Sequence, residues 1–310
     1  MDETPRHLTP GTATPNRRTV MLAAAMSVMA AFPDQAVQFS TNRVLGPTPT
    51  SAAGNDSNAA VDTNSAPQPP AHSVQDRPLP PPKNDTINTY TGRTPRYWGL
   101  EAPGVLTKLP QGTAGIAVTI DFCGGPGGNG YDRTLIAALR ARRIPATLFL
   151  NSRWITANTG TARELAAEPL FELANHGTTH RPLSTTGNSA YGITGTRTVA
   201  EVYDEVMTND ALLTEMTGSR PRYFRPGTAY LDDVAATIVS SLGVSAVGFS
   251  INADGGATYP AATVTTETAK AKPGDIILCH GNHSGGGTAD GLVRALDKLA
   301  TNGTPFLPLP

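Results

Sequence analysis

The stretch GIAVTIDF, residues 115–122, sets the fold class of this chain. It is dense in β-branched residues and carries its charged residue, Asp121, only near its end, which is typical of a strand buried on both faces. A glycine-rich loop over residues 124–130 leads to Asp132, a predicted N-cap for a helix over residues 133–142. A strand, a loop and a helix in this order predict one parallel β/α unit.

The same alternation continues to the end of the chain. A capping box at Thr198 and Glu201 opens a helix that Gly218 closes. Further strands are expected at residues 146–150, 222–226, 244–250, 274–280 and 305–307, and further helices at residues 162–167, 234–242, 265–271 and 289–300. Six or seven such units in roughly 200 residues favour a small closed barrel over an open sheet, with functional groups gathered at the carboxyl ends of the strands.

Residues 1–92 differ in character from the rest. Arg17-Arg18 precede an apolar run at residues 20–32, which is shorter than the roughly 20 residues of a membrane span. Residues 1–35 are therefore expected to be a secretory signal, with the twin-arginine type as one form and no transmembrane span in the mature protein. The alternative is an unstructured terminus with a chance apolar stretch. Residues 36–92, rich in Pro, Ser, Thr and Asn, predict a disordered linker, and residues 93–310 a single catalytic domain.

Composition narrows the classes of partner. The formal net charge is −1, so no general attraction to nucleic acid or to an anionic membrane is expected. The chain has only two cysteines, so it is not a scaffold built from disulfides.

Chemically useful side chains stand where the predicted strands end. The stretch NHGTTH, residues 175–180, places two imidazoles four residues apart, on one face of a helix or turn, and such a pair suits a zinc-type ion. Taken alone, each polar residue has an ordinary explanation, such as a turn aspartate, an ion-pair arginine or a core histidine. Their order along successive β/α units instead favours one shared site, made of Asp121, His176, His180, Arg225, Asp254 and His280.

This order resembles the polysaccharide deacetylases of carbohydrate esterase family four. Their first motif, Thr-Phe-Asp-Asp-Gly-Pro, is matched at residues 119–126, their His-x-x-x-His motif at residues 176–180, and their Arg-Pro motif at residues 225–226. Asp254 matches the fourth motif loosely, and residues 278–280 match the Leu-x-His motif. The resemblance covers about residues 95–310, and five motifs in order make it specific.

The resemblance implies a distorted (β/α)7 barrel that removes N- or O-acetyl groups from a polysaccharide with the help of a divalent metal. The histidine pair would bind the metal, with zinc expected and cobalt or nickel able to replace it. Asp121 would be the general base, and Arg225 and Asp254 would orient and tune that base. His280 would be the acid that protonates the leaving amine or alcohol.

The first motif departs from the family at the third metal ligand. The family has a second aspartate there, whereas this chain has Phe122, which cannot coordinate a metal. Asp121 could itself move to the metal, or the third position could be filled by water, by Asp132 or by the thiolate of Cys123.

The two cysteines pose a related question. Cys123 follows the first strand and Cys279 lies in a late strand that neighbours it, or nearly so, if the barrel closes. A disulfide between them is therefore expected in an oxidising compartment. Two free buried thiols and a metal-bound Cys123 are the alternatives, and a bridge would exclude the metal-bound form.

The expected function is that of an exported, monomeric deacetylase acting on N-acetylglucosamine in a cell-wall or related polysaccharide. One alternative is a catalytically inactive carbohydrate-binding protein. The missing aspartate favours it, but a binder has no need of the retained Asp121, Arg225 and His280. A hydrolase for a small amide is the other alternative, which a closed pocket would indicate.

Overall fold

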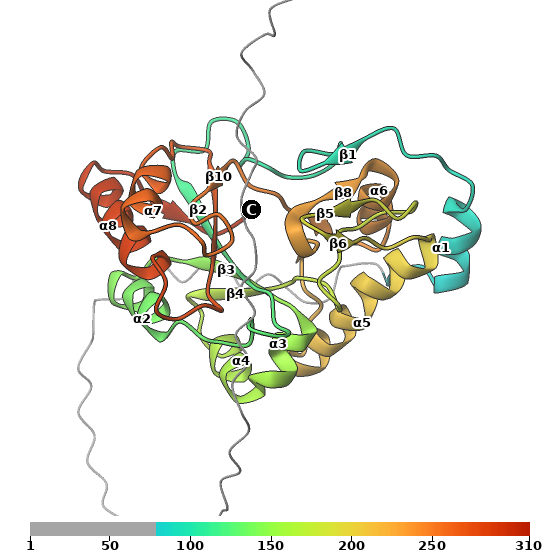
Figure 1. The fold of residues 1–310 in the computed structure, drawn as a ribbon, viewed down its shortest axis with the longest axis horizontal. Coiled ribbons are helices and arrows are strands. Elements are labelled where there is room, and N and C mark those ends of the chain that lie inside the picture. Colours follow the sequence, from blue (N-terminus) through green and yellow to red (C-terminus); the bar gives the residue numbers. More distant parts are fainter. Residues whose placement is uncertain (1–78) are drawn as a thin grey trace, which may run out of the picture. The chain divides into compact units, whose positions relative to one another are not determined.

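A computed structural model describes residues 79–310. Its core is a sheet whose seven main strands follow the order β10-β11-β2-β3-β4-β7-β9, with every neighbouring pair parallel (Figure 1). The strands are β2 (Ile116–Phe122), β3 (Ala146–Leu150), β4 (Phe171–Asn175), β7 (Tyr223–Phe224), β9 (Ser245–Ala246), β10 (Ile251–Asn252) and β11 (Ile276–His280). The expected α/β fold with seven parallel strands is confirmed.

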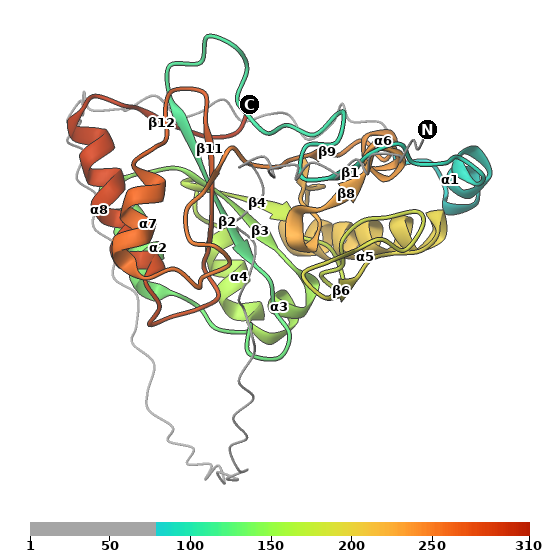
Figure 2. The same cartoon turned by 45° about the horizontal axis from the view of Figure 1, so that its top comes forward.

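Helices cover the outside of this curled sheet. They are α2 (Arg133–Arg142), α3 (Ser152–Ala157), α4 (Thr159–Ala166), α5 (Val199–Thr217), α6 (Asp233–Ser241), α7 (Ala261–Thr268) and α8 (Thr288–Thr301). Figure 2 shows α2, α7 and α8 together on one side of the sheet. The predicted caps are confirmed: the Asp132 and Thr198 side chains accept from backbone N–H groups at the starts of α2 and α5, and Gly218 ends α5 in the left-handed conformation.

The sheet is a half-barrel, because its end strands β9 and β10 do not pair with each other. The predicted strand over residues 244–250 is broken between them. There the carbonyls of Val247 and Gly248 accept hydrogen bonds from the Arg225 guanidinium, at 3.1 and 2.7 Å, instead of from a neighbouring strand. The segment at residues 106–109 bonds to both sides, through Leu106 N–H to the Ala246 carbonyl and Leu109 N–H to the Gly274 carbonyl.

Strand β2 occupies the middle of the sheet and sends alternate side chains to opposite faces. Ile120 and Phe122 join the apolar core beneath α2 and α8, whereas Thr119 and Asp121 turn inward to polar partners. In the register with β11, His280 lies directly beside Asp121. The last short strand, β12 (Phe306–Leu307), pairs with the start of β2.

Helix α1 (Lys83–Tyr90) corrects the predicted linker boundary. It buries Thr86 and Tyr90 and packs with Ile87 against the cluster of α5 and α6, so the end of the stretch expected to be a linker is folded. The signal segment and the linker up to residue 78 lie outside the described residues. Among the remaining small elements, β1 (Trp98–Gly99) pairs with β8 (Leu231–Asp232), and β5 (Ser189–Ala190) forms a hairpin with β6 (Ile193–Thr194).

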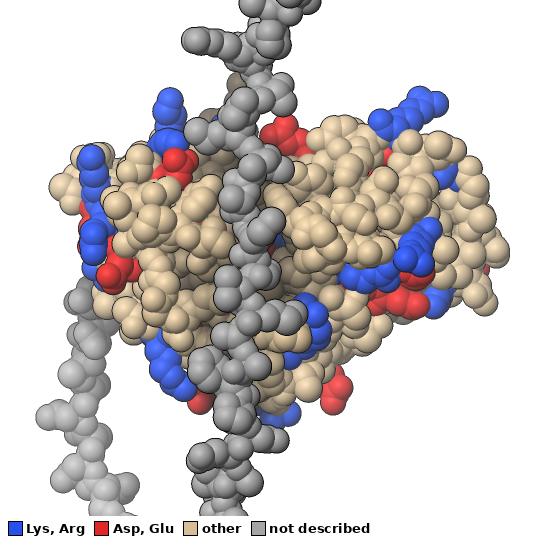
Figure 3. All heavy atoms as spheres, viewed as in Figure 1, with Lys and Arg blue, Asp and Glu red and all other residues tan. Residues whose placement is uncertain are grey.

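Two surface properties bear on partners. No helix within residues 79–310 is both long and apolar enough to cross a membrane. On the face drawn in Figure 3, basic side chains lie beside acidic ones, so no field of a single sign is formed there.

Candidate metal centre and active site

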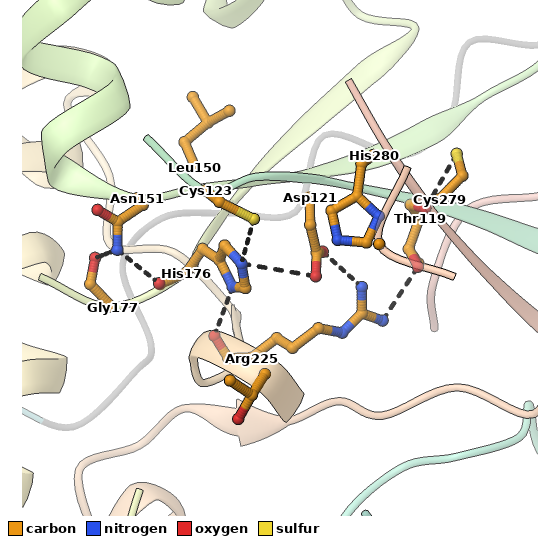
Figure 4. A network of polar contacts seen from close by, with 12 residues as sticks. Thr119, Asp121, Cys123, Leu150, Asn151, His176, Gly177, Arg225, Cys279 and His280 are labelled. Atoms are coloured by element: carbon orange, nitrogen blue, oxygen red, sulfur yellow. Dashed lines mark hydrogen bonds and ion pairs between the residues drawn. The ribbon is translucent and has the colours of Figure 1, made fainter. Parts of the chain in front are cut away.

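The predicted site residues meet at the carboxyl ends of the central strands (Figure 4). Asp121 stands near the end of β2 and His280 at the end of β11, while His176 directly follows β4 and Arg225 directly follows β7. Parallel strands bring these ends to one edge, as the sequence predicted. His180, Asp254 and Cys123 come from the loops that leave the same edge.

Arg225 holds Asp121 from beneath. Its guanidinium is fully buried and donates from one nitrogen to Oδ1 of Asp121 at 2.7 Å and from another to the Thr119 hydroxyl at 3.0 Å. The same guanidinium lies 4.2 Å from the centre of the Phe149 ring. Because the guanidinium is fully buried and held by several partners, its charged hydrogen bond fixes the direction of the Asp121 carboxylate. The expected contact between Arg225 and Asp121, the expected base, is therefore present.

His176 has one ring nitrogen committed and one aimed at the site. Its Nδ1 lies 2.9 Å from the Arg225 carbonyl, which can only accept, so Nδ1 carries the proton and Nε2 presents its lone pair. Nε2 lies 3.7 Å from Sγ of Cys123 and 3.5 Å from Oδ2 of Asp121. Burial opposes a charge on His176, but the Asp121 carboxylate and Cys123 outweigh it and raise the pKa of the imidazole. Negative groups that favour a proton at this point also favour a metal cation.

The second histidine completes a compact set of donors. The His180 ring stands edge-on to the His176 ring with 4.9 Å between centroids. One ligand atom from each of Cys123, His176 and His180 lies within 4.8 Å of the other two. Among residues 79–310, these three form the group of His, Cys, Asp or Glu side chains that is close enough to share a metal ion. Two imidazoles and one thiol are ligands that zinc takes in proteins, so the residues present fit a metal of that type.

Phe122 and Asp132 stand outside the donor set. The Phe122 ring is buried on the opposite side of β2, 4.5 Å from the Trp154 ring. Asp132 is used as a helix cap, with Oδ1 accepting from the Leu135 N–H at 3.0 Å. Of the alternatives for the third ligand position, Cys123 is the side chain that the structure places beside both histidines.

The predicted disulfide is wrong, because both cysteines are free. Cys279 pairs in register with Ile120 and is buried in the apolar core, with its thiol 3.7 Å from the Thr119 carbonyl. Cys123 instead turns to the histidines. Burial opposes ionisation of the Cys123 thiol, but hydrogen bonds from His176, His180 and His280 outweigh burial and hold its pKa well below the usual range.

His280 has its own carboxylate partner, which corrects one predicted contact. Asp254 was expected to tune the base, but its Oδ1 lies 2.9 Å from Nδ1 of His280 and its Oδ2 accepts the His280 backbone N–H at 2.7 Å. Thr288 donates to the same oxygen at 3.0 Å. Burial disfavours the charged imidazole, but the Asp254 charge and hydrogen bond outweigh it, so the pKa of His280 is raised well above its usual value. Asp254 therefore orients the expected acid.

Buried groups that sequence reasoning missed hold the loop that carries the histidine pair. The Glu205 carboxylate, from α5, accepts from the Thr179 N–H at 2.9 Å, from the Thr179 hydroxyl at 2.6 Å and from the Arg181 N–H at 3.2 Å. Asn151 donates to the carbonyls of His176 and Gly177, at 2.9 and 2.8 Å. Glu205 lies three residues after Val202 and directly before Val206, which are apolar residues on the buried side of α5, and this position was the signal available.

A comparison with protein families finds one match to this architecture. The polysaccharide deacetylase family model matches residues 109–247, a range that contains Asp121, the histidine pair and Arg225. The resemblance to polysaccharide deacetylases that the sequence predicted is thus confirmed over residues 109–247. No curated protein matches it.

Solved structures of this deacetylase family share the fold. A peptidoglycan N-acetylglucosamine deacetylase, in complex with 4-naphthalen-1-yl-N-oxidanyl-benzamide, gives a TM-score of 0.56 at 22% identity, over 67% of this chain and 91% of that chain. PdaA of Bacillus subtilis, a family 4 carbohydrate esterase, gives 0.52 at 20% identity, over 78% and 96%. A family 4 pseudoenzyme from Bacillus anthracis gives 0.55 at 20% identity, and the match spans 66% of each chain. At these identities the likeness establishes the fold alone.

The expected site residues thus lie in contact with one another. Asp121, the expected base, is paired with Arg225, and His280, the expected acid, is paired with Asp254. The histidine pair lies against Asp121, since Nε2 of His176 is 3.5 Å from its Oδ2.

Proposed function

We propose that the chain is a metal-dependent deacetylase that removes acetyl groups, N-linked ones foremost, from a polysaccharide such as a cell-wall glycan. The observation that carries this is the presence of a carboxylate and an imidazole, each with its own charged partner, beside one histidine pair. Arg225 supports Asp121, and Asp254 supports His280. A protein that only bound a glycan would have no use for a base and an acid with independent buried partners.

Asp121 is the base of the proposed reaction. Arg225 donates to its Oδ1, which leaves Oδ2, on the side of His176, to accept a proton from the attacking water. A divalent metal held by the histidine pair would acidify water and polarise the acetyl carbonyl. The buried guanidinium keeps the carboxylate aimed at that point throughout the reaction, because its remaining donors bond to Thr119 and to two backbone carbonyls.

His280 is the acid. Its Nδ1–H is held by Asp254, so the second proton of the charged ring is on Nε2, from which it is given to the leaving nitrogen or oxygen. Burial opposes this charged form, but the Asp254 carboxylate outweighs burial and raises the pKa of His280. A base and an acid acting from different strands each contribute roughly 10²–10⁴-fold to the rate.

One observation favours a second candidate, a catalytically inactive glycan-binding protein. Phe122 stands where the family has an aspartate ligand, and a family 4 pseudoenzyme has a similar fold. A mutant of that pseudoenzyme with restored enzymatic activity has a similar fold as well, so the fold is compatible with both candidates.

Acetate release distinguishes the two candidates. The purified protein is incubated with N-acetylated and O-acetylated glycans, with and without added zinc or cobalt, and Asp121→Asn serves as the blank. We expect metal-dependent release from at least one N-acetylated polymer and none from the blank. Binding of the same polymers without release by the wild-type protein would establish the inactive binder instead. The proposed site of action is outside the cytoplasm, which secretion of the full chain fused to a reporter would test.

A further inference from the structure

We infer that the metal of this chain is held by one thiolate and two imidazoles, with Cys123 taking the ligand position that a carboxylate occupies in its family. This inference rests on the proposed function for the presence of a metal, and it concerns a residue to which the family motifs assign no role. It is carried by the closeness of the three ligand atoms, of which Cys123 and His176 are seen in Figure 4, and by the contacts that the other candidate ligands make.

The spacing of the donor atoms is that of a metal site. With usual bond lengths of about 2.3 Å to sulfur and about 2.0–2.1 Å to nitrogen, two ligands of a tetrahedral zinc ion lie about 3.6 Å apart. Sγ of Cys123 and Nε2 of His176 are 3.7 Å apart, and the His180 donor lies within 4.8 Å of both. The three atoms therefore need only small shifts to meet one ion.

The competitors for the third position are less well placed or have another role. Oδ2 of Asp121 is 3.5 Å from Nε2 of His176, but that oxygen is needed as the base, and Asp121 falls outside the compact donor set. Asp132 caps α2, and Phe122 is packed in the core on the other face of the strand. Water is the competitor that remains, and the experiment below distinguishes it from the thiolate.

A thiolate ligand in place of a carboxylate leaves the charge of the site unchanged but makes the site a softer ligand set. A cysteine thiolate and an aspartate carboxylate each bring one negative charge, so the exchange leaves the net charge around a divalent ion the same. On binding, the Cys123 thiol gives its proton to solvent and its sulfur lone pair to the metal. Sulfur favours zinc and cobalt over magnesium and manganese, so we expect selectivity for the softer metals.

Cobalt substitution tests the inference by spectrum, without turnover. The full chain is titrated with Co²⁺, and a sulfur ligand gives an intense near-ultraviolet charge-transfer band in addition to the visible bands of the ion. We expect the band in the wild type and in Cys279→Ala, whose deleted thiol lies in the apolar core. Cys123→Ser should lose the band and bind the metal more weakly. The loss of affinity should exceed the roughly 10–100-fold that is typical when only a hydrogen-bond partner of a metal ligand is removed. Cys123→Asp should lose the band and keep binding.

Alkylation supplies a second readout that does not depend on folding of a variant. The half-exposed Cys123 thiol displaces iodide from iodoacetamide in the metal-free protein, and bound zinc should protect it. The buried Cys279 should stay unmodified in both samples and serves as the internal reference. Mass spectrometry of the peptides gives both values.

The outcomes separate this inference from the proposed function. Cobalt binding without the charge-transfer band, or equal alkylation of Cys123 with and without zinc, overturns the thiolate and leaves water as the third ligand. Acetate release by such a protein would keep the proposed deacetylase intact. The band together with binding but no acetate release would support the thiolate and reject the deacetylase.

Discussion

Removal of the Glu205 side chain tests how the loop that carries His176 and His180 is held in place. This side chain is 4% exposed and accepts from two backbone N–H groups and one hydroxyl in the loop between His176 and Arg181. Each donor left without a buried acceptor costs about 1–3 kcal/mol, and the exposed side of Thr179 lets water replace part of that loss. We therefore expect Glu205→Ala to lower the free energy of unfolding by about 2–3 kcal/mol.

The same change should also weaken metal binding. His180 follows Thr179 directly, so a loop released from Glu205 no longer presents both imidazoles to one ion. Partners of metal ligands are worth about 10–100-fold in affinity, and we expect a loss of that size for Glu205→Ala. Glu205→Gln keeps one acceptor oxygen and should fall between Glu205→Ala and the wild type. Urea unfolding and competition with a zinc chelator measure the two quantities.

Glu201 provides the matched control one turn earlier on α5. Its carboxylate bonds to the Arg181 guanidinium at 2.7 Å, and its side chain is 38% exposed. Exposed ion pairs contribute about 0–1 kcal/mol, so Glu201→Gln should change stability little and leave metal affinity unaltered. Equal zinc affinity in Glu205→Ala and Glu201→Gln would refute the idea that Glu205 positions the histidine loop.

Three further outcomes are expected. His180→Ala should abolish both bound metal, measured by elemental analysis, and acetate release; equal metal content in variant and wild type would contradict its assignment. Asp121→Asn should keep the metal and lose turnover by a factor of about 10²–10⁴, more than Asp254→Asn, whose loss acts through His280; loss of metal in Asp121→Asn would instead make it a ligand. Gly227→Ala should lower the free energy of unfolding, measured in urea, by about 1–3 kcal/mol, because the added Cβ would overlap the backbone of His180. Gly160→Ala, at an uncrowded position in α4, should raise it by up to about 1 kcal/mol.

Local signals predicted most of the scaffold. The helix over residues 133–142 and its Asp132 cap were predictable because capping is decided by neighbouring residues. The strand at residues 146–150 was predictable because a fully buried strand is uniformly apolar. Helix α1 was missed because its polar composition resembles that of the sequence before it. The helix is stabilised by packing against α5 and α6, chiefly by the burial of Tyr90.

Partners distant in sequence were harder to assign. The candidate site residues were found by their order along the chain, but this order does not say which carboxylate contacts which side chain. Asp254 was expected at the base and lies instead against His280, because β10 and β11 are neighbours while β2 lies one strand further on. The open side of the barrel was equally hard to predict, because the carbonyls of residues 247 and 248 bond there to the distant Arg225 side chain.

The departure at Phe122 has a simple explanation in strand geometry. Side chains alternate across a strand, so residue 123 returns to the side of Asp121 while residue 122 faces the core. Phe122 lies against Trp154, and the next residue, Cys123, turns toward His176. In this chain β2 runs through Phe122 before the loop begins, so the side chain that reaches the histidines comes one position later than the family motif places it. When the family motif is aligned residue by residue, the ligand is missing at residue 122. The alternation of side chains along the strand instead places the ligand at residue 123, where we infer that it is a thiolate.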